Sequence, residues 1–320
     1  MKKKAVIYLM TFITVYLFTF FVPRLMPGDA LAYLSESAIT NMEVTSLTPE
    51  DAMRAYYGLD LPIGEQFVRT LQRNLHGDLG ESIYYKQSVW HVVLTRMPWS
   101  LYIMSVTLGI SLLLGVLLAF ISVRRKRTDA FLYGLMTVQA ETPPFLLGVL
   151  LLFLVAAKVD WIPLSGAQSS FAFYQSSADR VRDLLVHSLM PICAMVLSAV
   201  PGFYMTARTS FLGILGRNYM ITAQAKGLPR GRVNRKYILK NAMAPIVARF
   251  FLSVGYCLSA TLLIENVFAY PGLGKLMRDA VLFRDYPLIQ GVFLISTTFV
   301  LLCSFLSDLI NERRLKGEEK

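Results

Sequence analysis

Six long apolar stretches constrain this chain to a membrane-spanning helical fold more strongly than any other feature. A helix needs about 20 residues to cross a hydrocarbon core of roughly 30 Å, and each stretch is close to that length. Apolar residues make up 55% of the 320 residues and the mean hydropathy is +0.50, which is more than a soluble core requires. The sequence therefore predicts an all-α polytopic membrane protein with six transmembrane helices. The predicted spans are Ala5–Val22, Leu101–Val123, Ala130–Ala157, Leu184–Ala207, Ala244–Ile264 and Leu288–Ile310.

The predicted spans divide the chain into four consecutive parts. Residues 1–26 are expected to form an N-terminal transmembrane helix, 27–98 an outer segment, 99–310 the transmembrane core and 311–320 a cytoplasmic tail. In the outer segment, Glu65–Leu75 carries apolar residues at helical spacing, so a short helix is predicted there. The glycines in Gly77–Gly80 indicate a turn after that helix.

The distribution of charge predicts the orientation of the chain. With the N-terminus inside, the inner segments hold 19 Lys and Arg residues, against 12 in the outer loops. The outer loops hold 15 of the 21 acidic residues. Cytoplasmic loops of membrane proteins carry an excess of Lys and Arg, so both termini are expected to be cytoplasmic. The net charge of +11 is then explained by topology, and nucleic acid is not expected as a partner.

The segment between the fourth and fifth spans has a pattern that an ordinary basic loop does not require. From Arg208 to Lys240 it contains eight Lys and Arg residues and no Asp or Glu. Ala223–Leu228 indicates a short helix that is ended by Gly227, where a left-handed turn is expected. A second helical stretch leads to Pro245. A helix–glycine–helix unit of this kind can fit into a groove on another protein. The alternative is a solvated basic loop attracted to anionic lipid.

Glu141 is an acidic residue within the third predicted span. It lies about 16 Å along the helix, where a carboxylate is costly unless it faces a cavity or a partner. Pro143 and Pro144 follow at once, so the helix is predicted to be kinked or broken there. Glu141 could line a transport pathway or hydrogen-bond to a neighbouring helix. Arg249 is expected to extend towards the inner membrane surface rather than to pair with it.

Patterns of catalysis and metal binding are weak in this sequence. The three histidines have no Cys, His or carboxylate neighbours at metal-ligand spacing. A phosphate-binding loop requires G-x-x-x-x-G-K-[ST], and at Gly274-Lys275 the first glycine is replaced by Ala269 and the Ser/Thr by Leu276. The chain is therefore predicted to be non-catalytic, with no bound cofactor or metal.

Five motifs spread over most of the chain resemble the permease subunits of binding-protein-dependent ABC importers, in the peptide/nickel branch of that family. Each motif alone is weak, but together they occur in the expected order across the six spans. The matching segments are Pro27–Asp29, Tyr57–Asp60 with Gly77–Ser82, Ala223–Pro245, Glu265–Gly274, and Arg284–Pro287.

The resemblance implies a division of labour between several chains. A second, homologous permease subunit would complete the pathway in the bilayer of a bacterial or archaeal cell membrane. Two cytoplasmic ATPase subunits would bind ATP and Mg²⁺, and an external binding protein would deliver the substrate. The segment between the fourth and fifth spans would be the coupling loop that docks on the ATPase. The coupling residues implied are Ala223, Ala225, Lys226, Gly227, Leu228, Arg230, Arg232, Asn241 and Pro245.

The substrate class follows from the resemblance alone. Oligopeptides or dipeptides are expected, and nickel or a metal chelate is the alternative within the same family. A passive channel is an alternative of another class, but it would need polar pore rings or a filter motif. A membrane-embedded enzyme would need catalytic groups clustered at one depth, where Glu141 stands nearly alone.

Overall fold

The computed structural model describes residues 2–26, 54, 57–169 and 173–318 of the chain. Within these ranges the fold is helical, and the only extended pairing is an isolated bridge between Glu81 and Ser88. This confirms the predicted all-α class. The Pro27–Asp29 motif lies outside the described residues.

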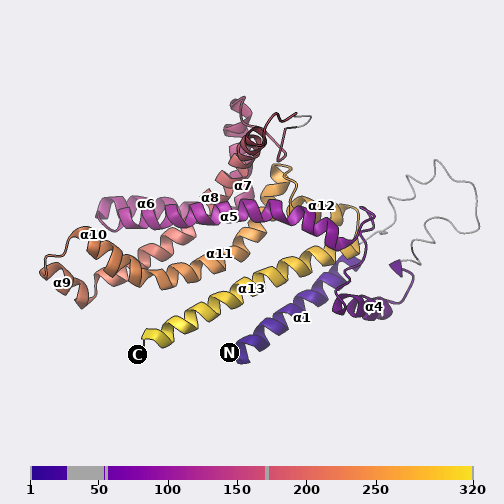
Figure 1. The fold of residues 1–320 in the computed structure, drawn as a ribbon, viewed down its shortest axis with the longest axis horizontal. Helices are drawn as coiled ribbons and strands as arrows, with labels where there is room; N and C mark the ends of the chain where they lie inside the picture. The colour runs from indigo at the N-terminus through magenta and orange to yellow at the C-terminus, as the bar shows by residue number, and fades with distance from the viewer. Residues whose placement is uncertain (1, 27–53, 55–56, 170–172, 319–320) are drawn as a thin grey trace, which may run out of the picture. The chain divides into compact units, whose positions relative to one another are not determined.

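The helices follow one another along the chain as Figure 1 labels them. Helix α4 confirms the short helix predicted after the first span, and its bounds extend the prediction by two residues at the N-terminal end. The long helices also run past the predicted spans at both ends, except that the helix of the second span ends at Ser122, one residue before the predicted end. The elements are α1 (Lys2–Arg24), α4 (Ile63–Leu75), α5 (Val89–Ser122), α6 (Lys126–Ala140), α7 (Pro144–Leu154), η1 (Ala156–Lys158), α8 (Ser177–Leu215), α9 (Asn218–Ala225), α10 (Arg230–Arg232), η2 (Val233–Leu239), α11 (Lys240–Val267), α12 (Leu273–Leu282) and α13 (Tyr286–Glu318).

The third predicted span is broken. In the described part of the chain, five helices are long and apolar enough to cross a membrane, and α6 with α7 makes a sixth span if the pair is counted as one. The two helices meet at an angle of 100° across residues 141–143. Pro143 has no backbone N–H to continue α6, and Pro144 is favoured in the first turn of α7, so the break follows from these two prolines.

Contacts within the chain define two compact units. Unit 1 contains residues 1–98 and 275–299, and unit 2 contains residues 99–274 and 300–320. In unit 1, Phe67 of α4 packs among aromatic rings of α1, with ring centroids 5.1 Å from Phe20 and 6.0 Å from Tyr16. The Asn74 side chain donates a hydrogen bond to the Tyr16 hydroxyl at 3.1 Å. The Arg24 Nε of α1 also donates to the Gln66 side-chain oxygen at 3.0 Å, so helix α4 is held against α1 by one aromatic ring and two polar contacts.

A buried carboxylate holds two of the sequence motifs together in unit 1. Asp285 is fully buried and accepts hydrogen bonds from the Ser82 hydroxyl at 2.5 Å and from the Tyr84 amide at 3.0 Å. The Leu288 amide, in the first turn of α13, donates to the same carboxylate at 3.1 Å. Burial raises the pKa of Asp285, and these hydrogen bonds partly offset that rise. The motif Gly77–Ser82 thus joins the start of α13.

In unit 2, α8 packs against α6, α7 and α11. Its central stretch carries many of the buried side chains of this unit, including Phe203 and Tyr204. Gly115 of α5 allows the closest approach to this stretch. A Cβ atom at Gly115 would lie 2.5 Å from the Phe203 Cβ and 2.9 Å from the Tyr204 backbone nitrogen. Small residues at such crossings let membrane helices pack closely.

We expect Gly115→Ala to destabilise the chain. The atoms that meet the new methyl group are the Phe203 Cβ and the backbone of α8, and a change of side-chain rotamer moves neither of them. Overpacking of this kind costs about 1–3 kcal/mol. Gly109→Ala on the same helix is the matched control, since no atom lies within 4 Å of its added Cβ. In thermal denaturation in detergent, the midpoint temperature should be lower than that of the wild type for Gly115→Ala only. Equal midpoints would contradict the close crossing.

A second buried carboxylate organises the connection after α11. Glu265 is fully buried and accepts hydrogen bonds from the Ser100 hydroxyl and the Gly274 amide, both at 2.5 Å. Gly272 is required beside it, because a Cβ there would lie 2.1 Å from the Glu265 carboxylate oxygen. The Glu265–Gly274 motif is therefore a folded connection in which the last residue donates a hydrogen bond to the side chain of the first.

Candidate coupling surface between α8 and α11

The predicted coupling loop folds as a short helical excursion between two long helices. Helix α8 ends at Leu215, α9 follows, and the chain turns at Gly227 into α10 and the π-helix η2, which continues into α11 (Figure 1). The unit is helical on both sides of the glycine, as its sequence predicts. A π-helical segment is rare and is found often at functional sites.

Gly227 has the backbone conformation that its sequence context predicts. Its φ angle is +65°, in the left-handed region that residues with a Cβ disfavour. No atom lies within 4 Å of a Cβ built at this position, so the space around it is open. The requirement for glycine is therefore one of backbone geometry and not of packing.

The inner side of the excursion is fixed by small and apolar side chains. Met220 and Ala223 of α9 are buried, as are Val233 and Ile238 of η2 and Ala242 at the start of α11. Helix α9 packs against η2, and η2 packs against α8. Ala223, which the family resemblance places in the coupling surface, thus faces the chain's own interior. Its small side chain allows α9 to lie close to η2.

The outer side of the excursion is exposed and basic. The Asn241 side-chain amide donates a hydrogen bond to the Tyr219 hydroxyl at 3.3 Å, which joins α9 to the start of α11. Leu228 is partly buried, and the side chain of Arg230 lies outside the described set. The exposed residues predicted for coupling are Ala225, Lys226, Gly227, Arg232, Asn241 and Pro245, and the basic residues Arg235, Lys236 and Lys240 are exposed beside them.

An ion pair anchors the end of α8 just before this excursion. Arg208 binds the Asp129 carboxylate in a bidentate manner, with Nε donating to Oδ1 at 2.6 Å and Nη2 donating to Oδ2 at 2.5 Å. The two side chains are 19% and 22% exposed. A fork of two parallel hydrogen bonds is the strongest geometry for such a pair. We call this pair, with its neighbours Ser122 and Tyr204, the α6–α8 clamp.

The α6–α8 clamp also reaches α5. The Ser122 hydroxyl donates to Asp129 at 2.5 Å and lies 2.7 Å from the Tyr204 hydroxyl, within the same network. The Arg208 guanidinium lies over the Tyr133 ring at 4.6 Å, which adds a cation–π contact. Sequence reasoning did not single out Asp129. The available signal was an acidic residue two positions after the basic run Arg124–Arg127.

Glu141 and Arg249 lie apart from the coupling surface. Glu141 caps the C-terminal end of α6 at the break and is exposed in the isolated chain. The Arg249 guanidinium packs on Gly202 of α8, where an added Cβ would lie 2.0 Å from Nη2. Its Nε is buried without a hydrogen-bond partner among the described residues. These two residues do not form an ion pair with each other in the described part of the chain.

Comparison with known proteins identifies the family. Residues 111–314 match the profile of the binding-protein-dependent transport system inner membrane components. The match covers more than half of the chain and includes both the coupling surface and the α6–α8 clamp. The chain belongs to this family.

Relatives of this transport component match almost end to end. The Di/tripeptide transport system permease protein DppB of Pseudomonas aeruginosa is 32% identical over 94% of this chain and 92% of its own length. The Dipeptide transport system permease protein DppB of Escherichia coli K12 gives the same values. The Oligopeptide transport system permease protein AppB of Bacillus subtilis is 25% identical over 91% of this chain and 90% of its own.

The solved structures that resemble this transport component show the same fold. A chain of the inward-facing MetNI methionine ABC transporter has a TM-score of 0.55 at 15% identity, covering 70% of this chain and 96% of that one. The comparison therefore supports the transmembrane architecture. The rest of this chain has no counterpart in that alignment.

Proposed function

We propose that this chain is one half of the translocation pathway of an ATP-driven importer for dipeptides and oligopeptides. The observation that carries the proposal is the match to peptide permeases over 94% of the chain. The exposed basic surface beside Gly227 supports it, because an importer of this kind needs a docking surface for its ATPase. A second, homologous permease subunit would supply the other half of the pathway.

In the proposed mechanism, the helical excursion around Gly227 carries force from the ATPase to the membrane helices. Two ATPase subunits bind ATP and Mg²⁺ and close together, and the excursion moves with them. The α6–α8 clamp transmits that movement to α5 and α6, because its hydrogen bonds join the C-terminal part of α8 to both helices. This chain itself binds no cofactor and catalyses no reaction. The helix bundles then rock and open the pathway to a loaded external binding protein.

The proposed topology places both termini in the cytoplasm. It puts the basic excursion on the cytoplasmic face of the cell membrane and α4 on the external face. The excess of Lys and Arg in the segments assigned to the inside supports this orientation. Single cysteines introduced at Lys226 and at Gln72 should react with an impermeant reagent from opposite sides. Reaction of both from the same side would contradict the topology.

Uptake by a strain that lacks this chain tests the proposed function. With the wild-type gene restored, a labelled dipeptide should accumulate only when the ATPase, the second permease and the binding protein are all present. Accumulation of nickel instead of peptide would assign the metal-chelate alternative. Flux that continues without the ATPase would assign a passive channel.

Pathway participation of Glu141 is tested in the same strain with Glu141→Gln, which should lower uptake of cationic peptides more than that of neutral ones.

A further inference from the structure

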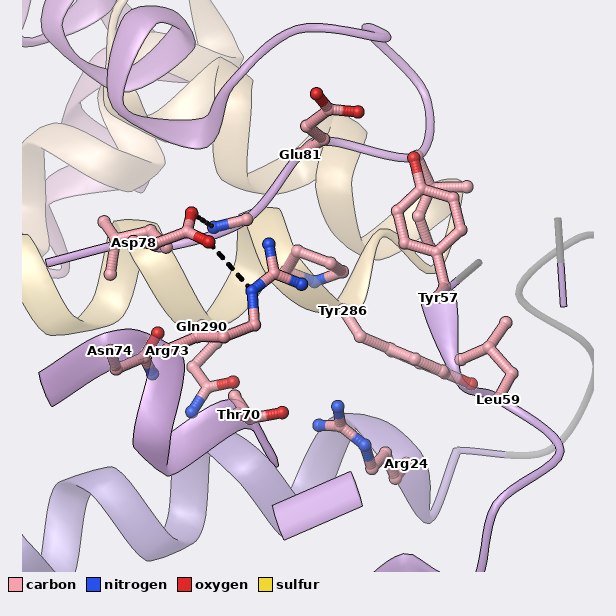
Figure 2. A pocket seen from close by; sticks show the side chains of 14 residues that line it. Arg24, Tyr57, Leu59, Thr70, Arg73, Asn74, Asp78, Glu81, Tyr286 and Gln290 are labelled. Carbon is pink, nitrogen blue, oxygen red and sulfur yellow. Dashed lines mark hydrogen bonds and ion pairs between the residues drawn. The ribbon is translucent and has the colours of Figure 1, made fainter. Parts of the chain in front are cut away.

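A polar pocket in unit 1 is not used by the coupling mechanism. It lies between α1, residues 57–59, α4, residues 78–83 and the start of α13, so all its walls belong to the same unit. Figure 2 shows Arg24 on one side and Glu81 on the opposite side, with the Arg73–Asp78 pair between them. Tyrosine side chains form part of the wall. The pocket therefore combines charged groups of both signs with aromatic surface.

The Arg24 guanidinium is held in a fixed position at this pocket. Its Nε donates to the Gln66 side-chain oxygen at 3.0 Å, and its Nη1 donates to the Phe20 carbonyl at 2.9 Å. The guanidinium lies over the Phe20 ring at 3.7 Å from the centroid. Gln66 is fixed in turn, since its amide donates to the carbonyls of Leu59 and Leu61. A ligand would thus meet a cation whose orientation is already set.

Arg24 has no carboxylate partner among the described residues. Its hydrogen bonds go to neutral oxygens, and its ring contacts are with Phe20 and Tyr286. Gln290 lines the same pocket and is 3% exposed, and its side-chain amide interacts with the Tyr16 hydroxyl of α1. Among the described residues, Arg24 is thus a partly buried cation that meets only neutral hydrogen-bond acceptors and rings, which favours an anionic group in the pocket.

The size and the charge balance of the pocket restrict the anion. The cavity measures about 60 Å³, which is room for only about four to six water-sized groups at 10–15 Å³ each. Its lining contains Arg24 and Arg73 but also Asp78 and Glu81, so the charges balance. The hydrogen bond from Arg73 lowers the pKa of Asp78, which keeps that carboxylate ionised. These acids would repel a doubly charged phosphate group about twice as strongly as a singly charged carboxylate, so the carboxylate is the favoured anion.

We propose that this pocket binds the terminal carboxylate of a peptide, with the carboxylate on Arg24 and the last side chain against the tyrosine walls. The inference rests on the proposed function and deepens it. In the proposed topology the pocket lies at the external end of α1, where a peptide leaves its binding protein. It selects for a free C-terminus, and it holds only the terminal residue because a whole peptide does not fit.

Equilibrium binding to the assembled complex tests this site. The permease–ATPase complex is purified without the binding protein, and labelled dialanine is compared with dialaninamide, which has the same shape but lacks the negative charge. Wild type should bind the acid at least tenfold more tightly than the amide, since a hydrogen-bonded charge pair is lost with the amide. Arg24→Gln should weaken the acid about tenfold and leave the amide unchanged, and Arg24→Lys should fall between the two. Arg69→Gln on the exposed side of α4 is the matched control and should behave as wild type.

Three results would overturn the inference. Equal binding of acid and amide by wild type would show that no carboxylate is recognised, and this comparison needs no variant that could misfold. Discrimination that survives in Arg24→Gln would place recognition elsewhere. Loss of uptake in Arg24→Gln with an unchanged acid-to-amide ratio would assign Arg24 to contact with the binding protein. Peptide uptake by wild type is measured in parallel. Absence of uptake would contradict the proposed function, whereas uptake together with equal binding of acid and amide would contradict only the assignment of the pocket.

Discussion

Replacing Gly227 with Val is expected to reduce peptide uptake by at least tenfold while the chain still inserts into the membrane. Gly227 has φ +65°, and a residue with a Cβ in the left-handed region costs of order 1–3 kcal/mol, or more when it is β-branched. Each 1.4 kcal/mol lowers the population of the native turn about tenfold relative to alternatives. Because no neighbouring atom is near, the strained backbone alone carries the effect.

Gly231→Val is the matched control for this prediction. Gly231 is also exposed and also has open space around its Cβ position, but it lies in α10 without a positive φ. It should retain most of the uptake, with a loss limited to the weak helix propensity of Val. The measurement is uptake at equal membrane abundance, together with the ATPase recovered on purification. If both variants lose the ATPase equally, the left-handed turn is not what the partner requires.

Breaking the α6–α8 clamp is expected to have the second largest effect. Removing one partner of a buried ion pair costs about 3–5 kcal/mol, and roughly 2–3 kcal/mol is expected here because about a fifth of each side chain is exposed. Asp129→Asn leaves Arg208 in place without its counter-charge. The thermal midpoint of the purified complex should fall, and ATP hydrolysis should continue with less peptide transported per ATP.

A second Arg–Asp pair in the chain provides an internal control for the clamp. Arg73 and Asp78 lie 2.9 Å apart, but their side chains are 52% and 57% exposed. Asp78→Asn should therefore cost less than about 1 kcal/mol. A double-mutant cycle with Asp129→Asn and Arg208→Gln should give a coupling energy well above that of the exposed pair. A coupling energy near zero would mean that α8 is held by packing alone.

Variants of the α6–α8 clamp can separate a loss of coupling from a loss of stability. A variant that only destabilises the fold should lower uptake and ATP hydrolysis together, in proportion to the amount of complex. Loss of the clamp should instead change the ratio of the two rates, because the coupling surface itself remains intact. Restoring the ratio by exchanging the charges of Asp129 and Arg208 would assign the effect to the ion pair.

Some features of this protein were determined by the sequence alone, because they depend on local physics. The length of an apolar stretch decides whether a helix can cross a membrane, so the spans were predictable without the fold. The left-handed turn at Gly227 and the break at Pro143-Pro144 were predictable because glycine and proline act on the backbone at their own positions. The bend of 100° was not, because packing against neighbouring helices sets the angle.

Tertiary structure alone decided which distant residues meet. Ser82 and Asp285 are about two hundred positions apart, and Asp129 and Arg208 nearly eighty, so no periodicity or spacing rule relates them. Residues 275–299 join unit 1 with the start of the chain, although they lie near its other end. The Arg24 pocket has the same origin: its walls come from five segments, and only long-range packing leaves one cation there without a carboxylate partner among the described residues.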